Sequence, residues 1–133
     1  MYGFHATLDM PFDAAVQKVI DALKAEGFGV LSDIDVQATL KAKLGADMAP
    51  YRILGACNPS FAHQALQIED KLGVLLPCNV IVRETADRRV EVASVDPVVS
   101  LGRTGNAALA STAEEVRRRL ASAIEAVASQ PAR

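Results

Sequence analysis

The sequence contains no tryptophan, and only 5% of its 133 residues are aromatic. Its core must therefore be built mainly from leucine, isoleucine, valine and alanine. A charge excess of one sign is also missing, because 14 Lys and Arg stand against 16 Asp and Glu, a formal net charge of −2. Proteins that bind nucleic acids or anionic membrane surfaces carry a basic excess, so we expect neither kind of partner.

The chain also lacks a long apolar segment. The longest uncharged apolar stretch, residues 72–82, is too short to cross a bilayer and contains Pro77 and Asn79. The chain does not begin with a basic segment followed by an apolar one, which a secretory signal would have. We therefore expect a cytoplasmic protein with no membrane partner, whose two cysteines, Cys57 and Cys78, need not form a disulfide.

The remaining composition is typical of one globular domain. A length of 133 residues lies in the usual single-domain range, and 50% hydrophobic with 23% charged residues exclude intrinsic disorder. We interpret residues 1–133 as a single domain and expect residues 129–133 to fray.

Five segments have the pattern of strands: residues 2–9, 28–36, 51–56, 75–84 and 89–95. In the fourth segment Val80 shares one face with Cys78, whereas Ile81 shares the other with Asn79. The short polar turn between the last two segments predicts a hairpin.

Helical spacing of apolar residues predicts four helices: residues 11–26, residues 38–44, residues 59–72, and a last helix that extends to about residue 127. Asn58 as the N-cap and Pro59 at the first helical position begin the third. The last begins at Asn106 or, through a capping box, at Thr112. Residues 98–105 are expected to be a loop.

This order of elements indicates an α+β fold, in which three long helices lie largely on one face of an antiparallel or mixed five-stranded sheet. The uncovered face is expected to carry apolar residues, Leu54 and Ile81 among them. Exposed apolar patches are typical of interfaces, and a twofold dimer is the commonest closed assembly. We therefore expect a homodimer formed through the sheet face or an edge strand.

Cys57 and Cys78 are the clearest candidates for chemistry, because each lies beside asparagine and proline at the end of an element. Thiolates bind zinc, Cu(I) or haem iron, or exchange with disulfides. Cysteine is also a common buried packing residue, and the ligand spacing of a zinc site is missing. The two thiols meet if the intervening helix folds back over one end of the sheet, and are separated if it makes a parallel crossover.

The positive end of the helix that begins after Asn58 is expected to make Cys57 the more acidic thiol. Glu69 falls within the apolar stripe of that helix, where its pKa would rise unless it is paired. It is either a general acid, base or hard metal ligand, or a stripe-edge carboxylate that reaches water or an arginine. His5 and His63 are expected to face solvent, and the arginines at 117–119 are interpreted as a solvated helix face.

Two runs, Tyr-Arg-Ile-Leu-Gly-Ala-Cys-Asn-Pro at 51–59 and Leu-Leu-Pro-Cys-Asn-Val at 75–80, resemble the signature of the domain of unknown function 302 family. The flanking pairs Asp96-Pro97 and Gly105-Asn106 match as well, although Ala107 stands where that family has proline. The resemblance implies a small domain with a TATA-binding-protein-like arrangement that is often a homodimer. It implies no established activity.

Our leading interpretation is a non-enzymatic module that binds a small molecule or cofactor, of unknown identity, as a homodimer. The alternatives are a thiol-dependent redox or catalytic protein that uses the same cysteines, and a dimerisation domain without a ligand. The candidate ligand-binding residues are Cys57, Asn58, Pro59, Glu69, Pro77, Cys78, Asn79 and Asp96.

Overall fold

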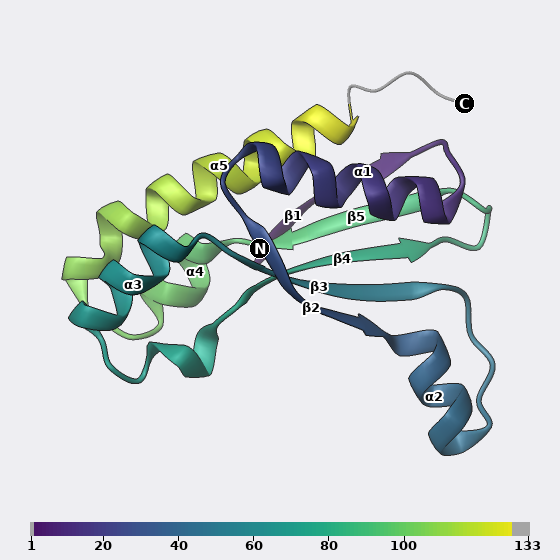
Figure 1. Ribbon diagram of the computed structural model, residues 1–133, viewed down its shortest axis with the longest axis horizontal. Coiled ribbons are helices and arrows are strands. Elements are labelled where there is room, and N and C mark those ends of the chain that lie inside the picture. The colour runs from purple at the N-terminus through teal and green to yellow at the C-terminus, as the bar shows by residue number, and fades with distance from the viewer. Residues whose placement is uncertain (1, 129–133) are drawn as a thin grey trace.

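The computed structural model describes residues 2–128. In this part of the chain five antiparallel strands form one open sheet in the order β1-β5-β4-β3-β2 (Figure 1). The expected α+β fold with a five-stranded sheet is confirmed. The expected fraying of residues 129–133 concerns residues outside those described. The strands are β1 (Gly3–Leu8), β2 (Gly29–Asp35), β3 (Tyr51–Cys57), β4 (Cys78–Glu84) and β5 (Val90–Val95).

Within the described residues, five α-helices and two short 3-10 helices accompany the sheet. Figure 1 shows α1 and α5 side by side over one face, α3 and α4 at one end, and α2 projecting from the opposite end. The helices are α1 (Phe12–Ala25), α2 (Val36–Leu44), α3 (Pro59–Ile68), α4 (Pro97–Gly102) and α5 (Ala110–Ala128), and the 3-10 helices are η1 (Leu72–Leu75) and η2 (Ala107–Leu109).

Two apolar clusters hold these layers together. The larger one joins the sheet to α1 and α5 and consists mainly of leucine, valine and alanine, as the scarcity of aromatic residues requires. The smaller one fixes α3, η1 and α4 against α5 beyond the end of the sheet, and it contains Ala65, Leu72, Leu101, Leu109 and Ala113. Of the three long helices, α3 therefore packs mainly on other helices rather than on the sheet.

The prediction that Leu54 points outward is wrong. Leu54 is fully buried and pairs with Val80 on the helix-covered face. Its neighbour Ile53 lies on the open face opposite Ile81. A row of side chains thus crosses the open face from β2 to β1, in the order Ile34, Ile53, Ile81, Ala93 and His5.

The prediction of a loop at residues 98–105 is also wrong, because α4 occupies most of this segment. Asp96 accepts a hydrogen bond from the backbone N–H of Val98 at 3.0 Å, and Pro97 takes the first helical position. This is the same start signal that Asn58 and Pro59 give α3.

One predicted helix end is wrong, and of the two predicted starts of the last helix the one at Asn106 is confirmed. The helix expected to reach Leu72 ends at Ile68, because Glu69 has an extended conformation and Leu72 is drawn into the smaller core cluster. At the other boundary Asn106 accepts a hydrogen bond from the N–H of Ala108 at 3.0 Å and caps η2, which leads directly into α5. The cap therefore lies at Asn106 rather than at Thr112.

Candidate functional site

The register of β3 and β4 places the two cysteines at adjacent positions of neighbouring strands. Ala56, the residue before Cys57, is directly opposite Cys78. The chain between them folds back over one end of the sheet, so the alternative of a parallel crossover is excluded. Both thiols are free.

Cys57 and Cys78 line one pocket of about 320 Å³, which we call the thiol pocket. Its walls come from α3, α5, the turn before β4 and the start of β2, and they are almost entirely apolar. Besides the cysteines and Asn58, the wall includes Phe28, Leu31, Phe61, Ala62, Ala65, Leu66, Leu72, Leu76, Pro77, Thr112 and Val116.

The two thiols have different surroundings. Cys78 is buried, and the loss of water around its sulfur raises its pKa to about 11, with a smaller contribution from Cys57. At neutral pH Cys78 is therefore protonated. Cys57 is only half-buried, at the last position of β3, and it is the thiol that reagents from solution reach more easily.

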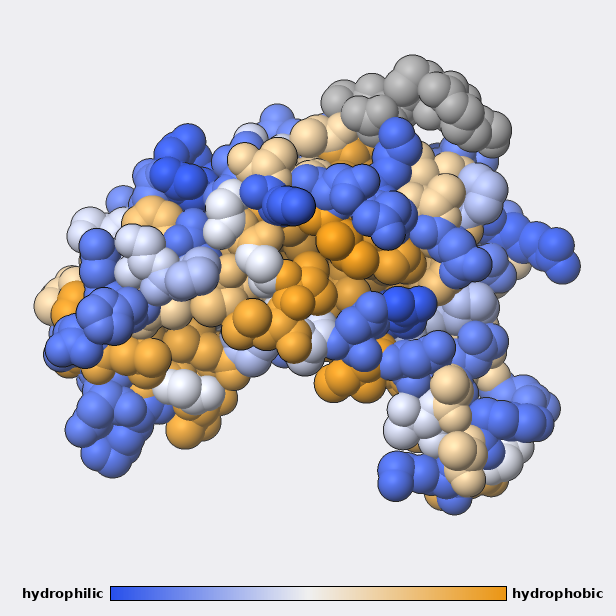
Figure 2. Space-filling view, in the orientation of Figure 1, coloured by the Kyte–Doolittle hydropathy of each residue, from blue (hydrophilic) through white to orange (hydrophobic). Residues whose placement is uncertain are grey.

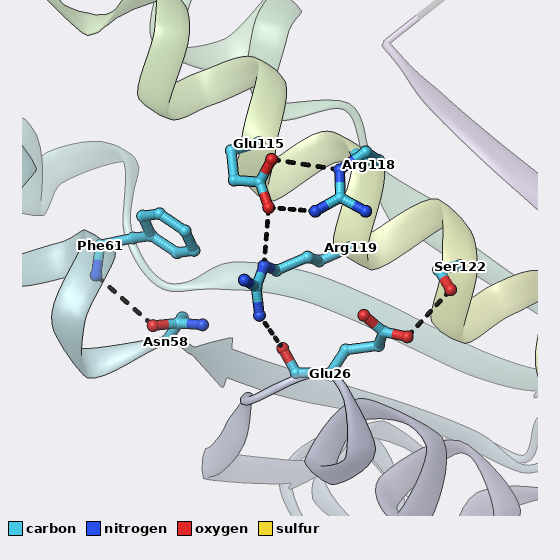
Figure 3. Close-up of polar contacts among 7 residues, drawn as sticks. All are labelled: Glu26, Asn58, Phe61, Glu115, Arg118, Arg119 and Ser122. Atoms are coloured by element: carbon cyan, nitrogen blue, oxygen red, sulfur yellow. Dashed lines mark hydrogen bonds and ion pairs between the residues drawn. The ribbon is translucent and has the colours of Figure 1, made fainter.

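Asn58 and Phe61 shape one wall of the thiol pocket. The side chain of Asn58 accepts a hydrogen bond from the backbone N–H of Phe61 at 3.4 Å and so caps α3 (Figure 3). The amide of Asn58 also lies against Gly27, where an added Cβ would come within 3.0 Å of it. Gly27 has φ +88°, a conformation that favours glycine, so the end of α1 and the start of α3 fit closely.

An arginine behind this wall connects three helices. The guanidinium of Arg119 lies 5.3 Å from the centre of the Phe61 ring, donates to Glu115 at 2.9 Å, and donates to the backbone carbonyl of Glu26 at 3.3 Å (Figure 3). Ser122 donates to the carboxylate of Glu26 at 2.9 Å. These contacts hold the aromatic wall of the pocket in place.

The contacts of Arg119 were not predicted from the sequence, which indicated a solvated helix face for residues 117–119. Arg118 and Arg119 both donate to Glu115, and these hydrogen bonds lower the pKa of Glu115 to about 2. Arg117 pairs with Asp96 at 2.9 Å. The signal available in the sequence was the spacing of Glu115 three and four residues before arginines.

The structure brings only part of the predicted set together. Cys57, Asn58, Pro77 and Cys78 line the thiol pocket, and Pro59 begins the helix that forms its wall. The other three candidates, Glu69, Asn79 and Asp96, do not line it.

Glu69, Asn79 and Asp96 lie elsewhere in the fold. Glu69 follows the last residue of α3 and accepts a hydrogen bond from Asn106 at 3.2 Å, so this carboxylate is paired. Asn79 is exposed on the open face of the sheet, and Asp96 caps α4. His5 and His63 are exposed, as expected.

A second hollow lies on the open face. This groove, of about 690 Å³, contains His5, Tyr51, Asn79, Ile81 and Arg83, together with residues of η1. Leu76 and Pro77 line both hollows, so one short segment separates the groove from the thiol pocket. Figure 2 shows apolar side chains in the recess between the body of the molecule and the projecting α2.

Pro77 lies directly on the sheet at Gly55. A Cβ added at Gly55 would be 2.7 Å from the ring of Pro77 and 2.2 Å from the hydroxyl of Ser32. Only glycine allows this approach, so Gly55 positions the segment that separates the two hollows.

Metal chemistry with three or more ligands finds no support in residues 2–128, which hold no such group of His, Cys, Asp and Glu side chains. A tetrahedral zinc site needs four ligands. Within the same residues, none of the helices is both long and apolar enough to span a membrane.

Comparison with known proteins gives a family and a fold. The family described as "Domain of unknown function DUF302" matches residues 4–127. The crystal structure of an uncharacterized conserved DUF302 protein from Bacillus stearothermophilus is similar, with 28% sequence identity and a TM-score of 0.87. The similarity covers 94% of this chain and 97% of that one. No curated protein matches this chain.

Proposed function

The chain belongs to the DUF302 family, and from that premise we propose that it is a non-enzymatic module that binds a small apolar molecule in the thiol pocket and acts as a homodimer. The observation that carries the ligand proposal is the pocket of about 320 Å³ whose walls are apolar except near the two thiols, Asn58 and Thr112. Small-molecule sites are concave and mainly apolar, with a few polar groups that orient the ligand.

The arrangement favours binding over catalysis. Cys78 is held as a thiol by burial, and the carboxylates proposed from sequence lie elsewhere. A nucleophile needs a base that activates it, and the two histidines are exposed and line no wall of this pocket. Free thiols also fit a reducing compartment such as the cytoplasm.

The ligand proposal can be tested with Nile red, a neutral dye whose fluorescence increases in apolar surroundings. We expect the dye to bind the folded protein saturably, and Ala62→Phe to abolish this binding, because the new ring fills the pocket from α3. Gln67→Phe is the matched control, since it adds the same ring to an exposed position of α3 outside the pocket. Equal dye binding by both variants would contradict the proposal.

The homodimer is supported by the row of apolar residues on the open face. Ile53, Ile81 and Ala93 are neighbours across three strands, and Ile34 on β2 extends the row. Beside it α2 projects from the sheet and has no buried residue of its own (Figure 1). An isolated nine-residue helix is marginal in water, so packing against a second copy would stabilise it.

Light scattering at micromolar concentration tests the assembly. We expect a mass of twice the chain's 14.1 kDa for the wild type, and the chain mass for Ile81→Lys. Gln17→Lys, on the exposed side of α1, is the control that should remain dimeric. A wild-type mass of one chain would refute the dimer and leave the ligand proposal untouched.

A further inference from the structure

The thiol pocket extends from an exposed lip to a buried end. Leu31 and Leu66 form the lip, and 71% and 39% of their surfaces are exposed. The inner walls include Ala65, Leu72 and Leu101, which are buried and belong to the smaller apolar cluster. A ligand that fills the pocket therefore has one end near solvent and the other among apolar side chains.

Helix α3 faces the pocket with apolar side chains that the protein itself leaves mostly unburied. Within Pro59–Ile68 only Ala65 is buried. Phe61, Ala62 and Leu66 line the pocket, but each keeps part of its surface exposed. Helices in proteins owe most of their stability to the packing of an apolar face, so a ligand beneath α3 would complete the packing of this helix.

The pocket offers no partner for a charged ligand. Among residues 2–128, those that line it include no Lys, Arg, His, Asp or Glu, and their polar side chains are the two cysteines, Asn58 and Thr112. Arg119 lies behind the Phe61 ring and is already bound to Glu115 and to a backbone carbonyl (Figure 3). Moving an unpaired charge into apolar surroundings is costly, so these walls select an uncharged ligand.

The volume of the pocket limits the size of the ligand. A group of the size of water occupies about 30 Å³ in a liquid, and a methylene group is similar, so a pocket of about 320 Å³ holds roughly ten carbon atoms. From these observations we infer that the thiol pocket takes up an uncharged molecule with one apolar chain of about ten carbon atoms, chain end inward. This inference rests on the proposed function and names its class of ligand, of which a medium-chain primary alcohol is the simplest member.

The test is displacement of Nile red from the wild-type protein by primary alcohols of increasing length, each below its solubility limit. Each methylene group that enters the pocket should tighten binding about four-fold. We expect this gain at every step from 1-hexanol to 1-decanol, about 250-fold in all, and little further gain with 1-dodecanol. Decanoate at pH 8 should bind about 10-fold or more weakly than 1-decanol, because its charge finds no partner. Thermal unfolding ranks the same compounds without the dye, since a ligand of the folded state raises the melting temperature.

A variant of the buried end tests the length limit directly. Ala65→Leu fills that end with about three carbon atoms, so the gain in affinity should stop near 1-heptanol. Gln67→Leu is the matched control, because it adds the same atoms at an exposed position outside the pocket and should keep the wild-type series. An unchanged limit in a folded Ala65→Leu protein would overturn the inference.

The wild-type series decides the inference even if Ala65→Leu does not fold. A four-fold gain per carbon that continues beyond 1-decanol, or decanoate that binds as tightly as 1-decanol, would overturn it. Saturable dye binding that 1-decanol does not displace would overturn it as well and leave the proposed function intact. Absence of dye binding together with an unchanged melting temperature would instead contradict the proposed function itself.

Discussion

The carboxylate of Asp96 joins two helices through Arg117. One oxygen accepts a hydrogen bond from the Nε of Arg117 at 2.9 Å, and the other caps α4 at the N–H of Val98. The guanidinium of Arg117 also lies 5.6 Å from the centre of the Phe4 ring on β1. Asp96, a ligand candidate from sequence, therefore fastens α4 to α5 and the sheet.

We predict that Asp96→Ala lowers the free energy of unfolding by about 1–2 kcal/mol, which combines a lost helix cap with a lost, partly exposed ion pair. Asp96→Asn should cost about half as much, because an amide oxygen still caps the helix. Urea unfolding measures both changes. Nile red binding should be retained in both variants, and its loss in a folded Asp96→Ala protein would place Asp96 in the ligand site after all.

A second prediction concerns the close approach at Gly55. Gly55→Ala must displace Ser32 or Pro77 and should destabilise the protein by about 1–3 kcal/mol, as overpacking does. Gly29→Ala is the matched control on the neighbouring strand, because nothing lies within 4 Å of its added Cβ. Thermal unfolding of the two variants should therefore differ clearly, and equal melting temperatures would show that the Pro77 segment moves freely.

Acid lability provides a third prediction. The pKa of Glu115 is lowered from 4.5 to about 2 by hydrogen bonds from Arg118 and Arg119. A lowered folded-state pKa stabilises the protein above pH 4.5, and this contribution disappears as the pH falls from 4.5 towards 2. We expect Glu115→Gln to remove this part of the pH dependence of unfolding.

Glu114→Gln, at the neighbouring exposed position, is the control that should keep the wild-type pH profile. Since the side chain of Glu115 is partly exposed to solvent, added salt should also reduce the effect. An unchanged acid profile in Glu115→Gln would mean that the arginines do not hold this carboxylate in solution.

The sequence predicts those elements whose side chains follow one clear period. In β4 the alternation of the buried Cys78, Val80 and Val82 with less buried neighbours gave the correct faces. In β3 the adjacent residues Ile53 and Leu54 are both apolar, so no alternation decides which faces the helices. The answer depends on register with β4, which single-chain periodicity does not contain.

In the candidate site, too, local sequence patterns were predictive, whereas contacts between distant segments were not. The two Cys-Asn segments marked the thiol pocket, but their meeting depends on the antiparallel pairing of Ala56 with Cys78. The wall residue Phe61 and its contact Arg119 are 58 residues apart, and only the packing of α3 near α5 joins them. Helix α4 was missed although Asp96 and Pro97 repeat the start signal of α3, because the two glycines of the segment, Gly102 and Gly105, indicated a loop.

The last prediction distinguishes the two thiols in solution. In the Cys57→Ser variant at pH 8, Cys78 should react with iodoacetamide about 100-fold more slowly in the folded protein than in urea. Burial accounts for this difference, because it restricts access and raises the pKa of Cys78 to about 11, which leaves only about one thiolate in a thousand at this pH. In Cys78→Ala the half-buried Cys57 should react with far less protection. Equal protection of both thiols would mean that the pocket is closed in solution, and the binding-site proposal around them would have to be abandoned.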